Sequence, residues 1–114
     1  MEVTLRHVDG RSVCERCTVA KTPVARMIGL LGRSRLEEGE GLWLEPASSI
    51  HTAFMRFPID AVFLDSDRVV VKVAAEVRPW RASAFRRARA VLELPAGEAA
   101  RRGLSPGTAL RAAT

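Results

Sequence analysis

The sequence predicts an α+β domain: a curved, mostly antiparallel β-sheet that forms a partly closed barrel with two short flanking helices. Two observations carry this prediction. Short segments with strand-like alternation recur along the chain and are separated by turn residues, whereas only two segments have helical character. The strands also do not alternate with helices as they would in a parallel βαβ fold. A chain of 114 residues fits a single domain, residues 1–114.

The N-terminal segment is expected to form a hairpin followed by a helix. Residues 2–8 alternate polar and apolar side chains, Asp9-Gly10 is a two-residue hairpin signal, and residues 11–20 return as a second strand. Thr22 is a suitable N-cap for a helix over residues 23–31, whose apolar side chains recur at helical spacing.

The middle of the chain is expected to supply the centre of the sheet. Residues 32–41 form a charged loop, and a strand follows in which Trp43 points away from its two leucine neighbours, so we expect Trp43 to be partly exposed. Residues 59–64 are almost continuously apolar and indicate a central strand. Residues 69–73 pair with it in a second hairpin.

The C-terminal third has weaker signals. Residues 77–89 contain several arginines without periodicity and are expected to form a long surface connection. A strand over residues 90–94 and a short helix within residues 95–102, closed by Gly103, follow. A last strand is expected around residues 108–111.

The charge balance is basic, but it does not by itself indicate nucleic-acid binding. The net charge is +5, from 18 basic and 13 acidic residues, and since only Lys21 and Lys72 are lysines, the other 16 basic residues are arginines. Abundant arginine and alanine are what a GC-rich genome produces. The sequence has no secretory signal and no apolar run of about 18 residues, so we expect a soluble, cytoplasmic monomer that does not contact membranes.

The segment from Ile50 to Asp60 contains the most chemistry. It brings an imidazole (His51), a guanidinium (Arg56) and a carboxylate (Asp60) into eleven residues. Arg56 is able to bind a carboxylate or phosphate, and His51 is able to transfer a proton near neutral pH. These residue types form either a ligand pocket or a structural network in which Asp60 satisfies backbone groups and Arg56 pairs with it.

Three stretches of this chain resemble one family. The first is Arg26-Met27-Ile28-Gly29-Leu30-Leu31-Gly32-Arg33; the second joins His51-Thr52, Met55-Arg56, Phe57-Pro58-Ile59-Asp60 and Val62-Phe63-Leu64-Asp65; the third is Ala90-Val91-Leu92-Glu93-Leu94-Pro95-Ala96-Gly97. Together they are similar to the motifs of the domain-of-unknown-function 192 family, also called uncharacterised protein family 0127. The resemblance covers residues from about Val19 to Leu110.

The resemblance implies a curved antiparallel sheet with flanking helices and no particular activity. Many members carry Trp-Met and Asn where this chain has Phe54-Met55 and Phe57, which removes any polar role at Phe57. We therefore predict a binding or accessory module for an anionic ligand or a protein partner, without a cofactor. The candidate ligand-binding residues are His51, Thr52, Met55, Arg56, Asp60, Trp43 and Trp80. The alternative is an enzyme in which His51 is the acid or base, Asp60 orients it and Arg56 holds substrate charge.

A third hypothesis is nucleic-acid binding through the arginine-rich connection. Its candidate residues are Arg78, Arg81, Arg86, Arg87 and Arg89, beside Trp80 and Phe85. No nucleic-acid-binding motif is present, so a solvated loop with Trp80 packed on the sheet is preferred and a nucleic-acid partner is not expected.

Cys14 and Cys17 form an isolated Cys-x-x-Cys motif. On a regular strand their side chains point to opposite faces, with α-carbons about 10 Å apart, too far for a disulfide. Zinc would need two further ligands, and His7, diagonal to Cys14, would supply only one. We expect two free thiols and no metal site.

Overall fold

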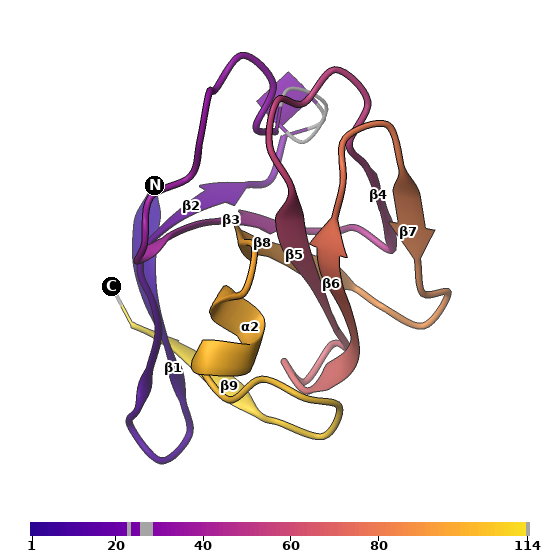
Figure 1. Ribbon diagram of the computed structural model, residues 1–114. Helices are drawn as coiled ribbons and strands as arrows, with labels where there is room; N and C mark the ends of the chain where they lie inside the picture. The colour runs from indigo at the N-terminus through magenta and orange to yellow at the C-terminus, as the bar shows by residue number, and fades with distance from the viewer. Residues whose placement is uncertain (23, 26–28, 114) are drawn as a thin grey trace.

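The computed structural model describes residues 1–22, 24–25 and 29–113, and its dominant feature is β-sheet (Figure 1). The described strands form a seven-stranded sheet and a separate two-stranded sheet. The elements in chain order are β1 (Glu2–His7), β2 (Ser12–Ala20), β3 (Glu40–Leu44), β4 (Ser49–His51), β5 (Ile59–Leu64), β6 (Val70–Val77), β7 (Ala82–Ala84), β8 (Ala90–Pro95), the helix α2 (Glu98–Arg101) and β9 (Leu110–Ala113).

The predicted N-terminal hairpin is confirmed, and it contains a β-bulge that the sequence did not predict. Val3 lies opposite Cys17 and Leu5 lies opposite Cys14, so three steps along β2 face two along β1. The extra residue turns both sulfurs to one side. The prediction that Cys14 and Cys17 point to opposite faces is therefore wrong: both belong to one core cluster and are 0% exposed.

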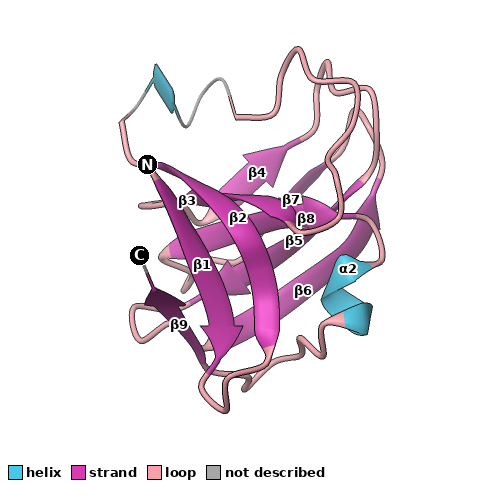
Figure 2. Ribbon diagram, turned by 90° about the vertical axis from the view of Figure 1, so that its left-hand side faces the viewer, coloured by secondary structure: helices cyan, strands magenta, loops and turns pink. Residues whose placement is uncertain are grey.

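The main sheet has the strand order β6-β5-β8-β3-β2-β1-β9 and is antiparallel except between β2 and β3. It curves along its length (Figure 2). Its two edge strands, β6 and β9, approach each other where Val69 and Ala109 form a single isolated bridge. The sheet is mostly antiparallel, as predicted, but it is not a closed barrel.

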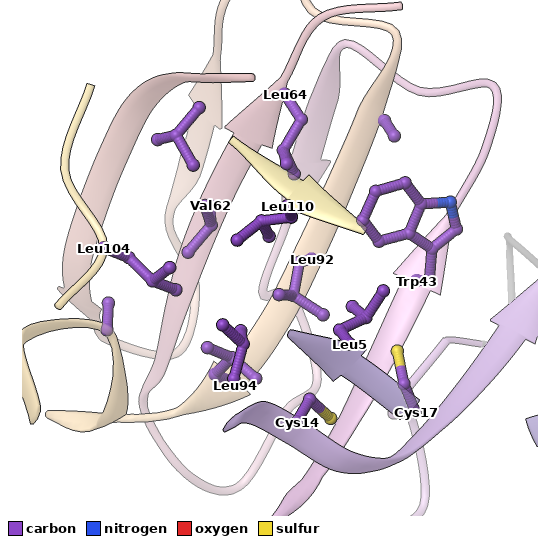
Figure 3. Close-up of a cluster of buried hydrophobic side chains, with 14 residues drawn as sticks. Leu5, Cys14, Cys17, Trp43, Val62, Leu64, Leu92, Leu94, Leu104 and Leu110 are labelled. Carbon is purple, nitrogen blue, oxygen red and sulfur yellow. The ribbon is translucent and has the colours of Figure 1, made fainter. Parts of the chain in front are cut away.

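Both faces of the central strands are buried, which divides the core into two clusters. All residues of β5 are buried, and so are those of β8 up to Leu94. One cluster includes Leu5, Leu92 and Trp43 (Figure 3), and the other packs against the opposite face of β5 and β8. Trp43 is only 4% exposed, so the expectation of partial exposure is wrong. Strand alternation does point Trp43 away from Leu42 and Leu44, but β3 has a core on each side.

α2 is the short helix whose whole length lies within the described residues, and residues 24–25 are helical as well. α2 occupies part of the predicted segment 95–102, and its residue Glu98 is buried and accepts a hydrogen bond from Arg102 Nε at 3.0 Å. The other predicted helix, over residues 23–31, includes residues 23 and 26–28, which lie outside the described residues. At its start, the Thr22 hydroxyl accepts a hydrogen bond from the Ala25 backbone N–H at 3.0 Å, the interaction expected of an N-cap.

The connection over residues 77–89 contains one element that the sequence did not predict. Within it, β7 pairs antiparallel with β4 in the separate two-stranded sheet. His51 lies opposite Ala82, and Ser49 lies opposite Ala84. The exposed side chains of this ladder are therefore mostly small. The chain leaves β4 at Thr52 and enters β7 from Arg81. The loop after β4 and the loop before β7 therefore meet the ladder at the same end.

Candidate functional site

Thr52, one of the predicted site residues, is a buried clamp that joins the loop after β4 to the loop before β7. Its backbone N–H donates to the Arg81 carbonyl at 2.8 Å, and its own carbonyl accepts hydrogen bonds from the N–H groups of Trp80 at 3.0 Å and Met55 at 3.1 Å. Its hydroxyl donates to the Arg78 carbonyl at 2.6 Å and accepts from the Arg81 N–H at 2.8 Å. Thr52 is 0% exposed, so this clamp is shielded from water.

The clamp holds two large aromatic side chains on the surface. Phe54 is 72% exposed and Trp80 is 59% exposed, and their ring centroids lie 4.6 Å apart at an interplanar angle of 60°. We call this pair the aromatic platform. The expectation that Trp80 packs on the sheet is wrong, because the Thr52 clamp turns its loop outward.

The backbone at both platform residues is strained. Phe54 and Trp80 each have φ of 65°, in the left-handed region that bulky residues rarely adopt. Such a conformation costs about 1–3 kcal/mol per residue and clusters at functional sites. Glycine would relieve the strain at either position, whereas the chain has an exposed ring at both.

Cationic side chains flank the platform in the sequence. Arg56, Arg78 and Arg81 are exposed, and among the described residues none of the three forms an ion pair. Arg81 Nη1 donates to the Trp80 carbonyl at 3.2 Å. His51 is exposed at the end of β4 and lines a shallow hollow of about 380 Å³ over the β4–β7 ladder. The site therefore combines exposed aromatic surface with unpaired positive charge.

The structure does not bring Asp60 into this site. Asp60 is 1% exposed, and its carboxylate accepts three backbone hydrogen bonds: from Glu76 at 2.8 Å, from Gly97 at 3.0 Å and from Ala99 at 2.9 Å. It thus satisfies backbone N–H groups at the N-terminus of α2 and at the bend at Glu76, where φ is 51°. No hydrogen bond or ion pair joins Asp60 to Arg56, which is exposed. Met55, another predicted site residue, is buried in the second core cluster.

Two further groups of predicted residues lie apart from the platform. Trp43 is in the core, where its Nε1–H donates to Glu45 Oε1 at 3.0 Å. Arg86, Arg87 and Arg89 are exposed but follow β7, whereas Arg78 and Arg81 precede it. Along the chain, the two groups are separated by β7, which is about 10 Å long, and by Phe85. The arginine-rich connection is therefore not one continuous basic patch along the chain.

Sequence reasoning missed two residues with unusual environments. Phe54 was considered only as a departure from the family motif, because nothing in the sequence indicates its backbone conformation. Glu93, in β8, is only 5% exposed, and burial raises the pKa of its carboxyl to about 7. An acidic residue inside an otherwise apolar strand was the available signal for Glu93.

The described residues contain no group of three or more histidine, cysteine, aspartate or glutamate side chains arranged to hold a metal ion. His7, the residue weighed as a partner for Cys14, is buried, and its Nε2 is hydrogen-bonded to the Arg102 carbonyl. Within the same residues, no helix is long and apolar enough to cross a membrane.

The fold and the site together define a small β-rich domain that presents strained surface loops beside a seven-stranded sheet. The chain belongs to the DUF192 family, described as "Uncharacterized ACR", whose family model matches residues 4–112. The resemblance noted in the sequence is thereby confirmed. No curated protein matches the chain.

Two solved structures are similar to this chain over most of its length. A protein of unknown function from Novosphingobium aromaticivorans is 30% identical, with a TM-score of 0.84, covering 97% of this chain and 84% of that chain. A protein from Sinorhizobium meliloti described as "a putative transcription regulator" is 25% identical, also with a TM-score of 0.84, covering 97% of this chain and 92% of that chain. The family and the first structure carry no established activity, so the function of this chain remains unknown.

Proposed function

We propose that this protein is a binding module whose aromatic platform, with Arg56, Arg78, Arg81 and His51 around it, receives an extended acidic segment of a partner protein. The observation that carries the proposal is the Phe54–Trp80 pair, two exposed rings held on left-handed backbone by a buried clamp. Aromatic and arginine side chains are the residue types that dominate the binding energy of protein interfaces. Here the hydrogen bonds of Thr52 hold the backbone of both loops, and the two rings contact each other, before the partner arrives, which lowers the entropic cost of binding.

Charge complementarity supports an acidic partner. Arg56, Arg78 and Arg81 have no ion-pair partner in the described parts of the chain. A guanidinium group binds a carboxylate through two parallel hydrogen bonds, so the three side chains suit aspartate or glutamate residues on the partner.

The two-stranded sheet supports an extended conformation for the bound segment. Its hollow is lined by Ser49, Ile50, His51, Ala82, Ser83 and Ala84. A floor of small side chains lets another backbone approach closely, and the ladder leads directly into the platform loops. The partly closed barrel predicted from the sequence belongs to this proposal. Such curvature of the main sheet would leave β4 and β7 outside the barrel, where a partner could reach them.

A peptide is favoured over single-stranded nucleic acid by the ring geometry. Stacking of successive bases uses aromatic faces, whereas Phe54 and Trp80 are inclined at 60° and engage each other edge to face. The Sinorhizobium protein is described as "a putative transcription regulator". Nucleic-acid binding is therefore tested as a competing outcome of the same experiment. The enzyme hypothesis has no supporting contact, because the Asp60 carboxylate is occupied by backbone groups and not by His51.

The test is a fluorescence-anisotropy titration with a labelled peptide of about six to eight residues, long enough at ~3.3 Å per residue to span the ladder and the platform. The peptide alternates acidic and apolar residues. A peptide with lysine in place of each acid and a single-stranded oligonucleotide are the comparison ligands. We expect saturable binding of the acidic peptide, weakened about tenfold or more by Trp80→Ala.

A matched pair of variants tests the location of the site. Arg56→Gln removes a cation beside the platform, whereas Arg86→Gln removes an equally exposed cation on the other side of β7. We expect only Arg56→Gln to weaken peptide binding. Preferential binding of the oligonucleotide, or equal effects of the two arginine variants, would reject the proposal.

A further inference from the structure

A second cavity lies away from the platform, where β1, β2 and β3 meet β9 and the turn between β5 and β6. Its volume is about 190 Å³, and none of the platform residues lines it. The apolar part of its wall is formed by Met1, Val3, Leu5, Val19, Trp43 and Ala112. Its polar groups come from Lys21, Glu45 and Arg68. An apolar wall with a few polar groups is typical of small-molecule sites.

Trp43 is held in a defined orientation at the base of this cavity. Its indole N–H donates to Glu45 Oε1 at 3.0 Å, which satisfies the only polar group of the ring. Leu5 and Trp43 belong to the same core cluster and lie beside each other at its margin (Figure 3). The small part of the indole that reaches the cavity is therefore carbon, and the partly exposed side chains of Val3 and Val19 extend this apolar lining.

Arg68 stands in a turn that would accept glycine more readily. Its φ is 59°, in the left-handed region, and its N–H donates to the Asp65 carbonyl at 3.1 Å. Asp65 fixes the turn further, because its Oδ1 accepts from the N–H groups of Asp67 at 2.9 Å and Val69 at 3.0 Å. Among the described residues the Arg68 guanidinium forms no ion pair or hydrogen bond. A strained arginine with an unused charge at an apolar cavity points to an anionic ligand group.

We propose that this cavity is a binding site for a small carboxylic acid with an apolar tail, whose tail lies against Trp43 and Leu5 and whose carboxylate binds Arg68. The cavity has the volume of roughly six water molecules at ~30 Å³ each, which suits an acid of about six carbons in total, with the carboxyl carbon included. The planar guanidinium group matches a carboxylate with two parallel hydrogen bonds. This site is separate from the platform and does not depend on the function proposed for it.

The experiment uses Trp43 fluorescence in the full chain carrying Trp80→Phe, so that Trp43 is the remaining tryptophan. Hexanoate is titrated beside hexanol and hexylamine, up to about 10 mM, where a Kd of about 1 mM gives near-saturation. We expect saturable binding of hexanoate and at least about tenfold weaker binding of the alcohol and the amine. Chemical-shift changes in the unsubstituted protein should map to Val3, Val19 and Ala112.

Two variants and one control variant test whether hexanoate binds in this cavity with its carboxylate at Arg68. Arg68→Gly removes the charge and relieves the left-handed backbone, so the Tm should be kept or raised while hexanoate binding weakens about tenfold or more. Ala112→Leu should abolish binding by filling the cavity. Arg111→Gln removes a neighbouring exposed charge that does not line the cavity and should leave binding unchanged. Absence of saturable binding, equal binding of hexanoate and hexanol, or unchanged hexanoate binding in Arg68→Gly would each overturn the proposal.

Discussion

Replacement of Glu93 by glutamine should stabilise the protein at neutral pH but not at acidic pH. Glu93 pairs with Leu42 on β3 and with Ala61 on β5, so its side chain shares a face with these two residues of the second core cluster. Burial in that setting raises the pKa of its carboxyl from 4.5 to about 7. The folded state therefore binds the Glu93 proton more tightly than the unfolded state does.

The size of the effect follows from the pKa difference. Below pH 4.5 the carboxyl is protonated in both the folded and the unfolded state, so it does not lower the free energy of unfolding. Between pH 4.5 and 7 the unfolded state loses its proton first, so the free energy of unfolding falls as pH rises; above pH 7 the cost is complete. A difference of about 2.5 pH units at ~1.36 kcal/mol each gives about 3 kcal/mol. Glutamine has no such titration.

The assay is urea denaturation of the wild type and Glu93→Gln at several pH values from about 4.5 to 8, over which the linkage acts. We expect the variant to gain up to about 3 kcal/mol relative to the wild type across this range. Glu38→Gln, at an exposed carboxylate, controls for the loss of one negative charge. A stability difference that stays constant with pH would refute the reasoning, because Glu93 would then be ionised in the fold at no cost.

Three other substitutions test the contacts described above by urea denaturation. Asp60→Asn should lower the free energy of unfolding by about 3 kcal/mol or more, because an amide cannot accept all three backbone N–H groups; a loss below 1 kcal/mol would contradict this. Thr52→Val should cost about 1–3 kcal/mol by leaving the Arg81 N–H unsatisfied, and should also weaken peptide binding; normal binding would show that the clamp does not hold the platform. The Arg102 guanidinium lowers the pKa of Glu15 to about 2, so this pair stabilises the fold above pH 4.5 and loses its effect as pH falls toward 2. Because Glu15 is 46% exposed, Glu15→Gln should cost only about 1 kcal/mol at pH 7, and an equal cost at pH 2.5 would contradict the linkage.

The sequence predicted those parts of the fold that depend on local signals. Asp9-Gly10 predicted the first hairpin because a two-residue turn needs residues that tolerate positive φ. The continuous apolar run over residues 59–64 predicted the buried central strand β5. Both features depend on residues close together in the chain.

Features that depend on distant residues were not predictable in the same way. The bulge that places Cys14 and Cys17 on one face adds a residue without a distinctive local pattern. The carboxylate of Asp60 binds N–H groups 37 and 39 residues away, so its structural use appears only once α2 is in place. Trp43 was misjudged because alternation along β3 cannot reveal that a core covers each face.

The candidate site was predicted in its residue types but not in its arrangement. His51, Thr52, Arg56 and Trp80 were identified from their motif and chemistry, and the structure joins their loops through Thr52. Phe54 was missed because a left-handed backbone at a phenylalanine has no sequence signature.

The most direct test of the binding module is a titration of isotope-labelled protein with the alternating acidic and apolar peptide, followed by backbone and indole NMR signals. The account predicts saturable shifts centred on Phe54, Trp80 and Arg81 that extend along β4 and β7, and their loss in Phe54→Ala. Shifts centred on Arg86 and Arg87, or no saturable shifts with the acidic peptide, would contradict the claim that the strained aromatic pair is the recognition site.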